Sequence, residues 1–496
     1  MQLSGVDIRQ LSQTGHAVLI AAHHDPGFLN DRNFGMVIGI EYLAAVLERN
    51  GWSVDLICGP RGERDLSRCL RGRKTSFVGI SSTTPAYRHA ERLGRVVRET
   101  APDTPVILGG YHASIYRGEV LRRSDAFDIV AVGEGEYIVE DLVSGTPLSE
   151  IQGLAFRRDG RVVETAARAP IADLDSLPWP ARGRFHASFR MEESFGMYPH
   201  VGLGGPDESA YVVTTRGCNN RCAFCRSSCI PALRTRSVSN VVQEIEALAS
   251  NGVRLINFTD PNFLHDASRA EDLARCLAPL NLRWICMARP EAMTERLCRI
   301  MVASGCALAE VGIETINPEL RRGWRKTGTP EDIRRGLACA GNAGLVTMAL
   351  MMIGPAECLS YIENDIDFVI DAGVDFVRVC PLTYYPGTEL WAAARRSGRI
   401  QSDWTERAIP VNEILTEIPE AWIARAVGRY FRRFYYRPRY LLRHLFKILL
   451  RRNWPVRRVT FGIAHAFMKT MLKSLLFQSV QALRTAYRSI VRAISG

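Results

Sequence analysis

Residues 214–225 read TTRGCNNRCAFC, and the three cysteines of this stretch, Cys218, Cys222 and Cys225, are spaced CxxxCxxC. Three thiolates this close together can each bind one iron of a [4Fe–4S] cluster. No fourth cysteine stands at a matching offset, so the pattern predicts one open iron, where chemistry takes place. The alternatives are three buried thiols or a zinc site, which usually takes four protein ligands and for which Cys229 could supply the fourth.

The spacing of these cysteines, with Phe224 directly before the last one, resembles the signature of the radical S-adenosylmethionine (SAM) superfamily. The resemblance implies that Phe224 lies in the cofactor site and that the open iron binds the amino and carboxylate groups of SAM. It also implies reductive cleavage of SAM to a 5′-deoxyadenosyl radical. An external one-electron reductant such as flavodoxin or ferredoxin is then expected as a partner.

Beyond residue 210, strand-like and helical patterns alternate six times. The strand-like runs are residues 211–215, 254–259, 282–288, 307–313, 346–353 and 375–381. Six such units predict an incomplete TIM-type (β/α)6 barrel, which the radical SAM resemblance also implies. Chemistry in such barrels lies at the carboxyl ends of the strands, and the cysteine loop follows the first strand.

Three charged residues follow other strands of the predicted barrel and are candidate SAM contacts. Asp260 follows the second strand, Arg289 ends the third and Glu314 ends the fourth. Carboxylates suit the ammonium and ribose hydroxyls of SAM, and an arginine suits its carboxylate. Asp260 is inferred from position alone, because the family's G-G-E motif is replaced by T-D-P. For each of the three the alternative is an ion pair between strands.

The first part of the chain, residues 16–150, predicts a doubly wound parallel sheet. Strand-like runs at 16–22, 53–59, 77–82, 106–110 and 129–136 alternate with helical patterns. Ligands of such Rossmann-like sheets lie at the carboxyl ends of the strands. The glycine and polar residues at these ends are Ser81, Ser82, Thr83, Gly109, Gly110, His112, Gly133, Glu134 and Gly135.

The segments GISSTT (79–84), GGYHAS (109–114) and VGEGE (132–136) resemble the cobalamin-binding domain that precedes many radical SAM domains. The resemblance implies that cobalamin binds at the residues just named. The D-x-H-x-x-G motif that supplies a histidine to cobalt in other cobalamin proteins is absent. We therefore expect cobalt without a histidine ligand; the alternative is a scaffold domain that has lost cobalamin.

Four regions follow from these patterns: a cobalamin-binding domain at 16–150, a connector at 151–209, the radical SAM partial barrel at 210–400 and a helical basic C-terminal region at 401–496. The connector begins with a predicted hairpin at 153–164, whose turn signal is Asp159-Gly160. It continues into the proline-marked stretch LPWP at 177–180.

The C-terminal region is strongly basic. After Glu420 the chain has 17 Lys and Arg residues and no Asp or Glu, while the whole chain carries a net charge of +11. Bulky apolar residues recur there at helical spacing, which is typical of a basic amphipathic helix on an anionic membrane. The alternative is a helical cap on the barrel, and no nucleic acid is expected as a partner.

Composition indicates an intracellular enzyme. Hydrophobic residues make up 47% of the 496 residues, enough for large cores, and the thirteen cysteines form no disulfide framework. The first fifteen residues have no apolar signal-peptide core, and no run of about 18 apolar residues occurs. We expect a cytoplasmic protein with peripheral contact at the inner membrane surface.

Both resemblances together imply a cobalamin-dependent radical SAM enzyme that C-methylates an unactivated carbon. Its substrate would be a small molecule, lipid-like or an intermediate of a natural product. The alternative enzyme is a radical SAM oxidative cyclase, or a rearrangement enzyme, that acts on a lipid or tetrapyrrole without methyl transfer. The non-catalytic alternative is a cobalamin or redox sensor, which would not accumulate 5′-deoxyadenosine when given a reductant.

Overall fold

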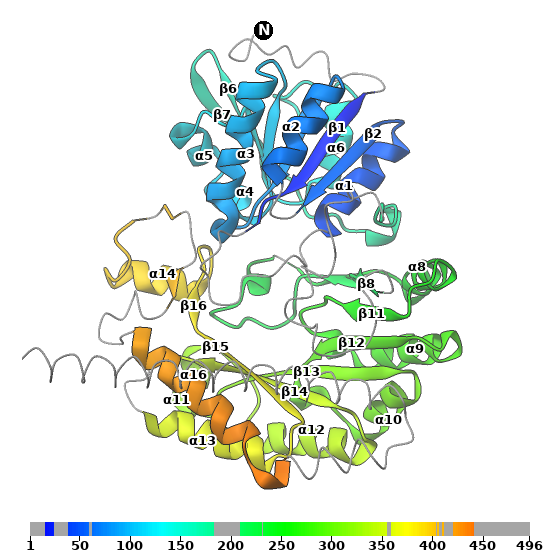
Figure 1. Cartoon of the computed structure of the whole chain (residues 1–496), viewed down its shortest axis with the longest axis vertical. Helices are drawn as coiled ribbons and strands as arrows, with labels where there is room; N and C mark the ends of the chain where they lie inside the picture. Colours follow the sequence, from blue (N-terminus) through cyan, green and yellow to red (C-terminus); the bar gives the residue numbers. More distant parts are fainter. Residues whose placement is uncertain are drawn as a thin grey trace, which may run out of the picture.

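This computed structural model describes residues 15–23, 38–58, 62–182, 209–230, 232–354, 359–402, 404–405, 409–410 and 420–440. They form two α/β units, each built on its own sheet. In Figure 1 the N-terminal unit lies above the barrel, and helix α16 lies along the lower part of the barrel. The expected fold class is confirmed.

The N-terminal sheet has the strand order β2-β1-β3-β4-β5-β6-β7. Its first five strands are parallel: β1 His16–Ala21, β2 Ser53–Cys58, β3 Phe77–Ser81, β4 Val106–Gly109 and β5 Ile129–Ala131. The order 2-1-3-4-5 is that of flavodoxin-like sheets, whose ligands bind where the order reverses, beside the carboxyl ends of β1 and β3. The connecting helices are α1 Ile38–Arg49, α2 Gly62–Gly72, α3 Tyr87–Thr100, α4 Tyr111–Tyr116, α5 Gly118–Arg123 and α6 Glu136–Val143.

The sequence of β1, HAVLIA, explains why the sheet is covered on both faces. Successive side chains of a strand point to opposite faces, and all of the central ones here are apolar. Leu19 joins one core with Leu47 of α1, and Ile20 joins the other core with Leu66 of α2.

The predicted hairpin at 153–164 is confirmed as β6 Leu154–Arg158 and β7 Arg161–Glu164, paired antiparallel. Its turn residues Asp159 and Gly160 both have positive φ, +50° and +74°, as a two-residue type I′ turn requires. The hairpin continues the N-terminal sheet through β5. Residues 154–164, which the sequence analysis assigned to the connector, are therefore part of the first unit.

The barrel sheet has the order β15-β14-β13-β12-β11-β8, with every neighbouring pair parallel. The strands are β8 Ser209–Val212, β11 Leu255–Phe258, β12 Arg283–Ala288, β13 Cys306–Glu314, β14 Thr347–Ile353 and β15 Phe376–Pro381. These are the six strands that the sequence predicts. Because β8 and β15 do not pair with each other, the barrel is open.

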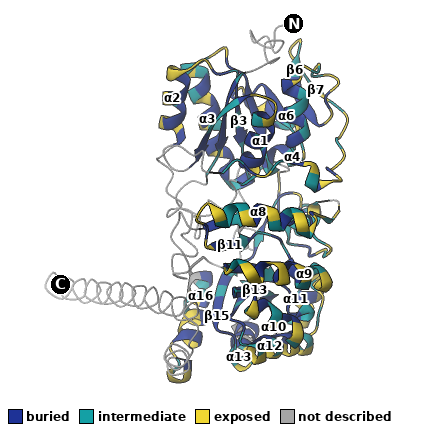
Figure 2. Cartoon of the chain, turned by 90° about the vertical axis from the view of Figure 1, so that its right-hand side faces the viewer, coloured by how far each residue is buried: buried dark blue, intermediate teal, exposed yellow. Residues whose placement is uncertain are grey.

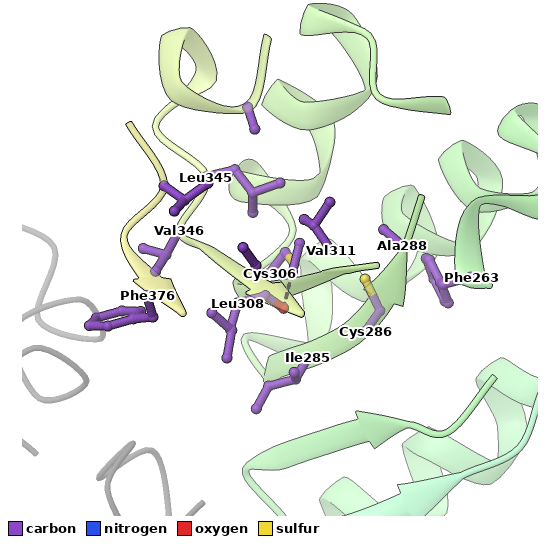
Figure 3. Packing of buried hydrophobic residues seen from close by; sticks show 14 of the residues in the cluster. Phe263, Ile285, Cys286, Ala288, Cys306, Leu308, Val311, Leu345, Val346 and Phe376 are labelled. Carbon is purple, nitrogen blue, oxygen red and sulfur yellow. Dashed lines mark hydrogen bonds between the residues drawn. The ribbon is translucent and has the colours of Figure 1, made fainter. Parts of the chain in front are cut away.

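Helices cover the outside of this sheet. They are α8 Val238–Ser250, α9 Ala267–Leu277, α10 Glu295–Ala303, α11 Pro318–Gly323, α12 Pro330–Ala343 and α13 Leu359–Asp371. Helix α14, Glu389–Arg396, packs in a separate apolar cluster with Trp324 and Tyr384. Figure 2 shows exposed residues on the outer faces of α8 and α9, while the strands are mostly buried. Between them is one continuous apolar core, part of which is drawn in Figure 3: Ile285, Leu308, Val311 and Phe376 are among its members.

Helix α16, Glu420–Tyr435, covers the β15 edge of the open barrel. The backbone N–H of Val377 donates to Tyr435 Oη at 3.0 Å, and the same hydroxyl donates to the carbonyl of Val377 at 2.9 Å. Tyr440 Oη donates to the carbonyl of Asp375. Two tyrosine hydroxyls thus satisfy three polar backbone groups of β15, the edge strand of this sheet among the described residues.

The apolar face of α16 packs on the barrel core through Tyr430 and Phe434, which are buried. Its basic face reaches α13, where Arg433 pairs with Asp367 at 2.5 Å. Residues 420–440 therefore form a helical cap on the barrel, which was the alternative to membrane contact. Membrane contact stays a prediction for residues 441–496, which lie outside the described residues. No helix among the described residues is long and apolar enough to cross a membrane.

We predict that Tyr435→Phe destabilises the barrel, because it leaves the buried N–H of Val377 without its acceptor. Such an orphaned group costs about 1–3 kcal/mol. Chemical denaturation should report a fall of that size in the free energy of unfolding. Tyr436→Phe, at an exposed neighbouring ring, is the control and should stay near wild type. Equal stabilities of the two variants would contradict this role of the Tyr435 hydroxyl.

Candidate functional site

The three cysteines lie on one loop directly after the first barrel strand. Short strands β9 Thr215–Arg216 and β10 Arg234–Thr235 pair antiparallel at its base and close residues 217–233 into the cysteine loop. Gly217 has φ +89°, and a Cβ atom there would lie 2.4 Å from the carbonyl oxygen of Ala232. Only glycine allows the chain to enter the loop this tightly.

Asp260 holds the beginning of the loop. Its carboxylate accepts hydrogen bonds from the backbone N–H of Thr214 and Thr215, both at 2.8 Å, and from their hydroxyls at 2.8 and 3.0 Å. Asp260 is fully buried. Burial raises its pKa, and these four donors oppose that rise. Its contacts are those of a residue that orients the cysteine loop, and its expected contact with SAM stays a prediction.

The sulfur atoms of the loop have polar neighbours. Cys218 Sγ accepts from the backbone N–H of Asn220 at 3.5 Å, and Arg289 Nη1 lies 4.0 Å from Cys222 Sγ. Burial raises the pKa of the Cys222 thiol, while the charges of Lys326 and Arg289 lower it. Two cations beside a buried thiol favour the thiolate that binds iron.

The three thiols are the candidate ligands of the predicted cluster. Within the described parts of the chain, no group of three or more His, Cys, Asp or Glu side chains could hold a single metal ion. A [4Fe–4S] cluster takes one thiolate at each of its ligated irons. Soft sulfur donors on one loop, with cations nearby, fit that cluster.

Phe224 is partly buried and packs against an apolar cluster that contains Trp324. Its ring makes an edge contact with Trp324, centroid to centroid 5.7 Å. The neighbouring Ala223 donates its backbone N–H to the carbonyl of Trp324 and accepts from the N–H of Leu390. Phe224 thus anchors the cysteine loop between α11 and α14, and its expected position in the cofactor site stays a prediction.

Arg289 and Glu314 lie at strand ends beside the cysteine loop. Arg289 Nη1 donates to Asn220 Oδ1 at 2.6 Å, while its other guanidinium nitrogens bond to Glu291. Glu314 ends β13 with φ +68°, a conformation that is costly for a residue with a Cβ atom, and it pairs with Lys326 at 3.2 Å. Both residues have internal partners in this structure, and their contacts with SAM stay predictions.

On the N-terminal unit, Ser82, Gly110 and His112 form one edge of the predicted cobalamin site. A Cβ atom at Gly110, where φ is +88°, would lie 2.7 Å from the carbonyl oxygen of Ser82. The backbone N–H of His112 donates to that same carbonyl. The glycine therefore brings β3 and β4 close together at their carboxyl ends.

His112 is fully buried, and neither of its ring nitrogens has a hydrogen-bond partner. Its ring stacks on Tyr87 at 4.0 Å and lies near Tyr116 and Trp404. Burial, together with the charge of Arg226, lowers its pKa to about 3, so the imidazole is neutral. A buried imidazole without a hydrogen-bond partner makes His112 a candidate residue of the predicted cobalamin site.

The remaining residues of this edge have different surroundings. Gly133, with φ +92°, has open space where a Cβ atom would lie, while a Cβ atom at Gly135 would lie 3.1 Å from Leu43. Ser81, Thr83 and Gly109 end β3 and β4 at the same edge and are partly exposed. A glycine with open space and an unpartnered imidazole on one edge fit a bulky polar cofactor.

Glu134 follows β5 at this edge, but its carboxylate contacts residues of the barrel. It accepts from Arg216 Nη1 at 2.9 Å and from Arg234 Nη1 at 2.7 Å, the two residues that pair across β9 and β10. It also accepts from the backbone N–H of Ile171. Its described hydrogen bonds are therefore to the barrel and to Ile171, and its contact with cobalamin stays a prediction.

Arg226, the residue after Cys225, was missed by the sequence analysis. Its guanidinium lies 4.0 Å from the ring centroid of Tyr111, in the N-terminal unit, and 5.7 Å from that of Tyr385, in the barrel. Burial lowers its pKa, and its Nη2 has no hydrogen-bond partner. A basic residue inside a motif of cysteines carries no pattern of its own, so only the structure shows its place between the two units.

Comparison with known proteins gives one family match in each of the two units. Residues 212–369 match the radical SAM superfamily, and residues 29–143 match the B12 binding domain. An uncharacterized methyltransferase of Pyrococcus horikoshii is 27% identical over 83% of this chain and 90% of its own length. An anaerobic magnesium-protoporphyrin IX monomethyl ester cyclase of Rubrivivax gelatinosus is 25% identical over 71% of this chain and 65% of its own.

A solved structure shares the fold. The radical S-adenosylmethionine methyltransferase TsrM of Kitasatospora setae, with tryptophan and a SAM analogue bound, superposes with a TM-score of 0.61 at 18% identity. The match covers 78% of this chain and 77% of that one. It therefore includes both units described above.

We predict that Asp260→Ala loosens the cysteine loop, because two backbone N–H groups and two hydroxyls lose their acceptor in a fully buried place. The free energy of unfolding should fall by about 2–4 kcal/mol, since each orphaned donor costs about 1–3 kcal/mol and the threonine hydroxyls can turn elsewhere. Iron content after reconstitution should also fall. Asp266→Ala, which removes the exposed cap of α9, is the control and should lose about 1 kcal/mol and keep its iron. Wild-type iron content in Asp260→Ala would contradict the assignment.

Proposed function

We propose that this protein, a radical SAM enzyme that carries a B12-binding domain, transfers a methyl group to an unactivated carbon of a small molecule. The observation that carries the proposal is the position of Arg226. It extends from the cysteine loop to Tyr111, the residue after Gly110 on the N-terminal edge. This contact brings the cysteine loop next to the predicted cobalamin edge, which supports one reaction that uses both cofactors.

The cofactors of the two domains are a [4Fe–4S] cluster, SAM and cobalamin. Together they supply an organic radical and a transferable methyl group when bound. Cys218, Cys222 and Cys225 would hold the cluster, and Arg289 and Glu314 would contact SAM. The cobalamin edge would be formed by the residues at the ends of β3, β4 and β5: Ser81, Ser82, Thr83, Gly109, Gly110, His112, Gly133, Glu134 and Gly135.

The protein's own residues orient these groups and exclude water. Asp260 fixes the chain before Cys218 through four hydrogen bonds. Arg289 and Lys326 place positive charge beside Cys222 and so stabilise its thiolate. Tyr87 and Trp404 enclose His112 on the other side and keep its surroundings dry. Such positioning in a water-poor site is the usual contribution of the protein in cofactor enzymes.

The alternative outcome is an oxidative cyclisation, because the relative from Rubrivivax gelatinosus is a cyclase by name. The two outcomes differ in the product, since methylation adds one CH2 unit whereas cyclisation removes hydrogen. Mass spectrometry of the product distinguishes them. In either case the proposal includes an external one-electron reductant and a small-molecule substrate, lipid-like or natural-product-like, in a cytoplasmic protein with peripheral membrane contact.

We predict that replacement of any one of Cys218, Cys222 and Cys225 by alanine abolishes SAM cleavage and leaves the fold intact. Each thiolate binds one iron, so the loss of one removes a ligand that no neighbour replaces. Iron and sulfide content, together with 5′-deoxyadenosine formed under reductant, measure the effect. Cys276→Ala, at an exposed thiol of α9, is the matched control and should behave as wild type. The same iron content and SAM cleavage in the triple alanine variant would overturn the assignment.

We predict that the reconstituted protein retains a base-off corrinoid and that His112→Phe lowers this retention. Phenylalanine keeps the stack on Tyr87 but removes both unpartnered nitrogens. Absorbance spectra after gel filtration measure the bound corrinoid. The control is His265→Phe, because His265 lies in the barrel and bonds the carbonyl of Asn262. Wild-type protein that retains no corrinoid would favour the scaffold alternative, and full retention by His112→Phe would remove that residue from the site.

A further inference from the structure

We propose that Glu134 is a positioning residue that fixes the distance between the two cofactor sites, by holding the base of the cysteine loop against the N-terminal unit. The expected effect of Glu134 on catalysis rests on the function proposed above. The contact itself is independent of that function, because it is made between residues of the chain.

One carboxylate bonds to both strands of the hairpin that closes the cysteine loop. Glu134 Oε1 accepts from Arg216 on β9 at 2.9 Å, and Oε2 accepts from Arg234 on β10 at 2.7 Å. Because these arginines are paired partners in the hairpin, any shift of Glu134 moves both strands together. Arg216 stands two residues before Cys218, so the position of the first iron ligand follows the position of Glu134.

Glu134 belongs to a larger set of alternating charges between the units. Arg216 also pairs with Glu136 of α6 and lies over the ring of Tyr42 of α1 at 5.2 Å. Arg182 lies 3.6 Å from Glu41 of α1 and also pairs with Glu244 of α8. The interdomain charge cluster thus consists of Arg182, Arg216, Arg234, Arg236, Glu41, Glu134, Glu136 and Glu244.

The surroundings of Glu134 make this contact strong. Burial alone raises the pKa of Glu134, but the bonds from Arg234 and Ile171 and the charge of Arg216 lower it below its ordinary value. The carboxylate is therefore charged at neutral pH. Removing one member of such a poorly hydrated set leaves charges without partners, which is far more costly than loss of a surface ion pair.

The position of the contact explains why it matters to methyl transfer more than to SAM cleavage. SAM cleavage needs residues of the barrel alone, whereas methyl transfer needs groups held by both units. A misplacement of about 1 Å between reacting groups costs about 100-fold in rate. Loosening of the interdomain charge cluster should thus lower methyl transfer and spare SAM cleavage.

The first test uses hydrogen exchange of the full chain without cofactors. Glu134→Gln keeps the size of the side chain but removes its charge, so exchange of the backbone amides at 214–216 and 234–236 should rise by about tenfold or more, as local opening becomes easier. Glu140→Gln, at a carboxylate on the same unit that pairs with Arg49 within that unit, is the matched control. Arg234→Gln, which breaks the contact from the other side, should reproduce the effect of Glu134→Gln.

The second test uses the reconstituted protein with SAM and titanium(III) citrate. The ratio of S-adenosylhomocysteine, from methyl transfer, to 5′-deoxyadenosine, from SAM cleavage, should fall about tenfold or more in Glu134→Gln, at equal corrinoid retention. Wild-type exchange rates at 214–216 and 234–236 in both variants would overturn the inference. The same holds if the wild type transfers methyl groups and Glu134→Gln has the wild-type ratio. A wild type that forms no S-adenosylhomocysteine would refute the proposed function instead, and the exchange test would then decide the inference alone.

Discussion

The carboxyl ends of two parallel sheets face each other in this protein, and the rest of the candidate site depends on that constraint. A parallel strand delivers its following loop to one edge of its sheet, so loops far apart in the sequence gather there. Glu134 follows β5 and Tyr111 follows β4, while Arg216 and Arg226 follow β8. These residues can meet only because the two edges are opposed, and they join the units by ionic and cation–π contacts.

The sequence predicted the elements of both sheets because their signals are local. A strand such as β1 is a continuous apolar run, and the turn of the hairpin at Asp159-Gly160 is a short-range signal. The roles of Asp260 and Glu134 could not be predicted in the same way. Asp260 bonds a residue 46 positions earlier, and Glu134 bonds one 100 positions later. A carboxylate at a strand end looks the same in sequence whether it faces a ligand or a distant arginine.

The C-terminal region shows a similar ambiguity in its apolar pattern. Apolar residues at helical spacing next to arginines suit a membrane surface and a protein core equally well. In α16 the pattern serves the core, because Tyr430 and Phe434 are buried on the barrel and Arg433 pairs with α13. The sequence around α16 does not reveal the acidic partner of Arg433, because Asp367 belongs to a helix more than sixty residues earlier.

The tyrosines that α16 presents to β15 also bear on how the chain is made. An edge strand with free N–H and C=O groups is a template on which another chain can add a strand, and that is a common route to aggregation. The barrel strands leave the ribosome before α16 does, so the β15 edge stays uncovered until residue 440 has been synthesised. A chain that stops short of α16 would carry its six-stranded sheet with that edge unprotected. Once α16 has been synthesised and packed, the β15 edge of the nascent barrel is no longer open to pairing with a strand of another chain.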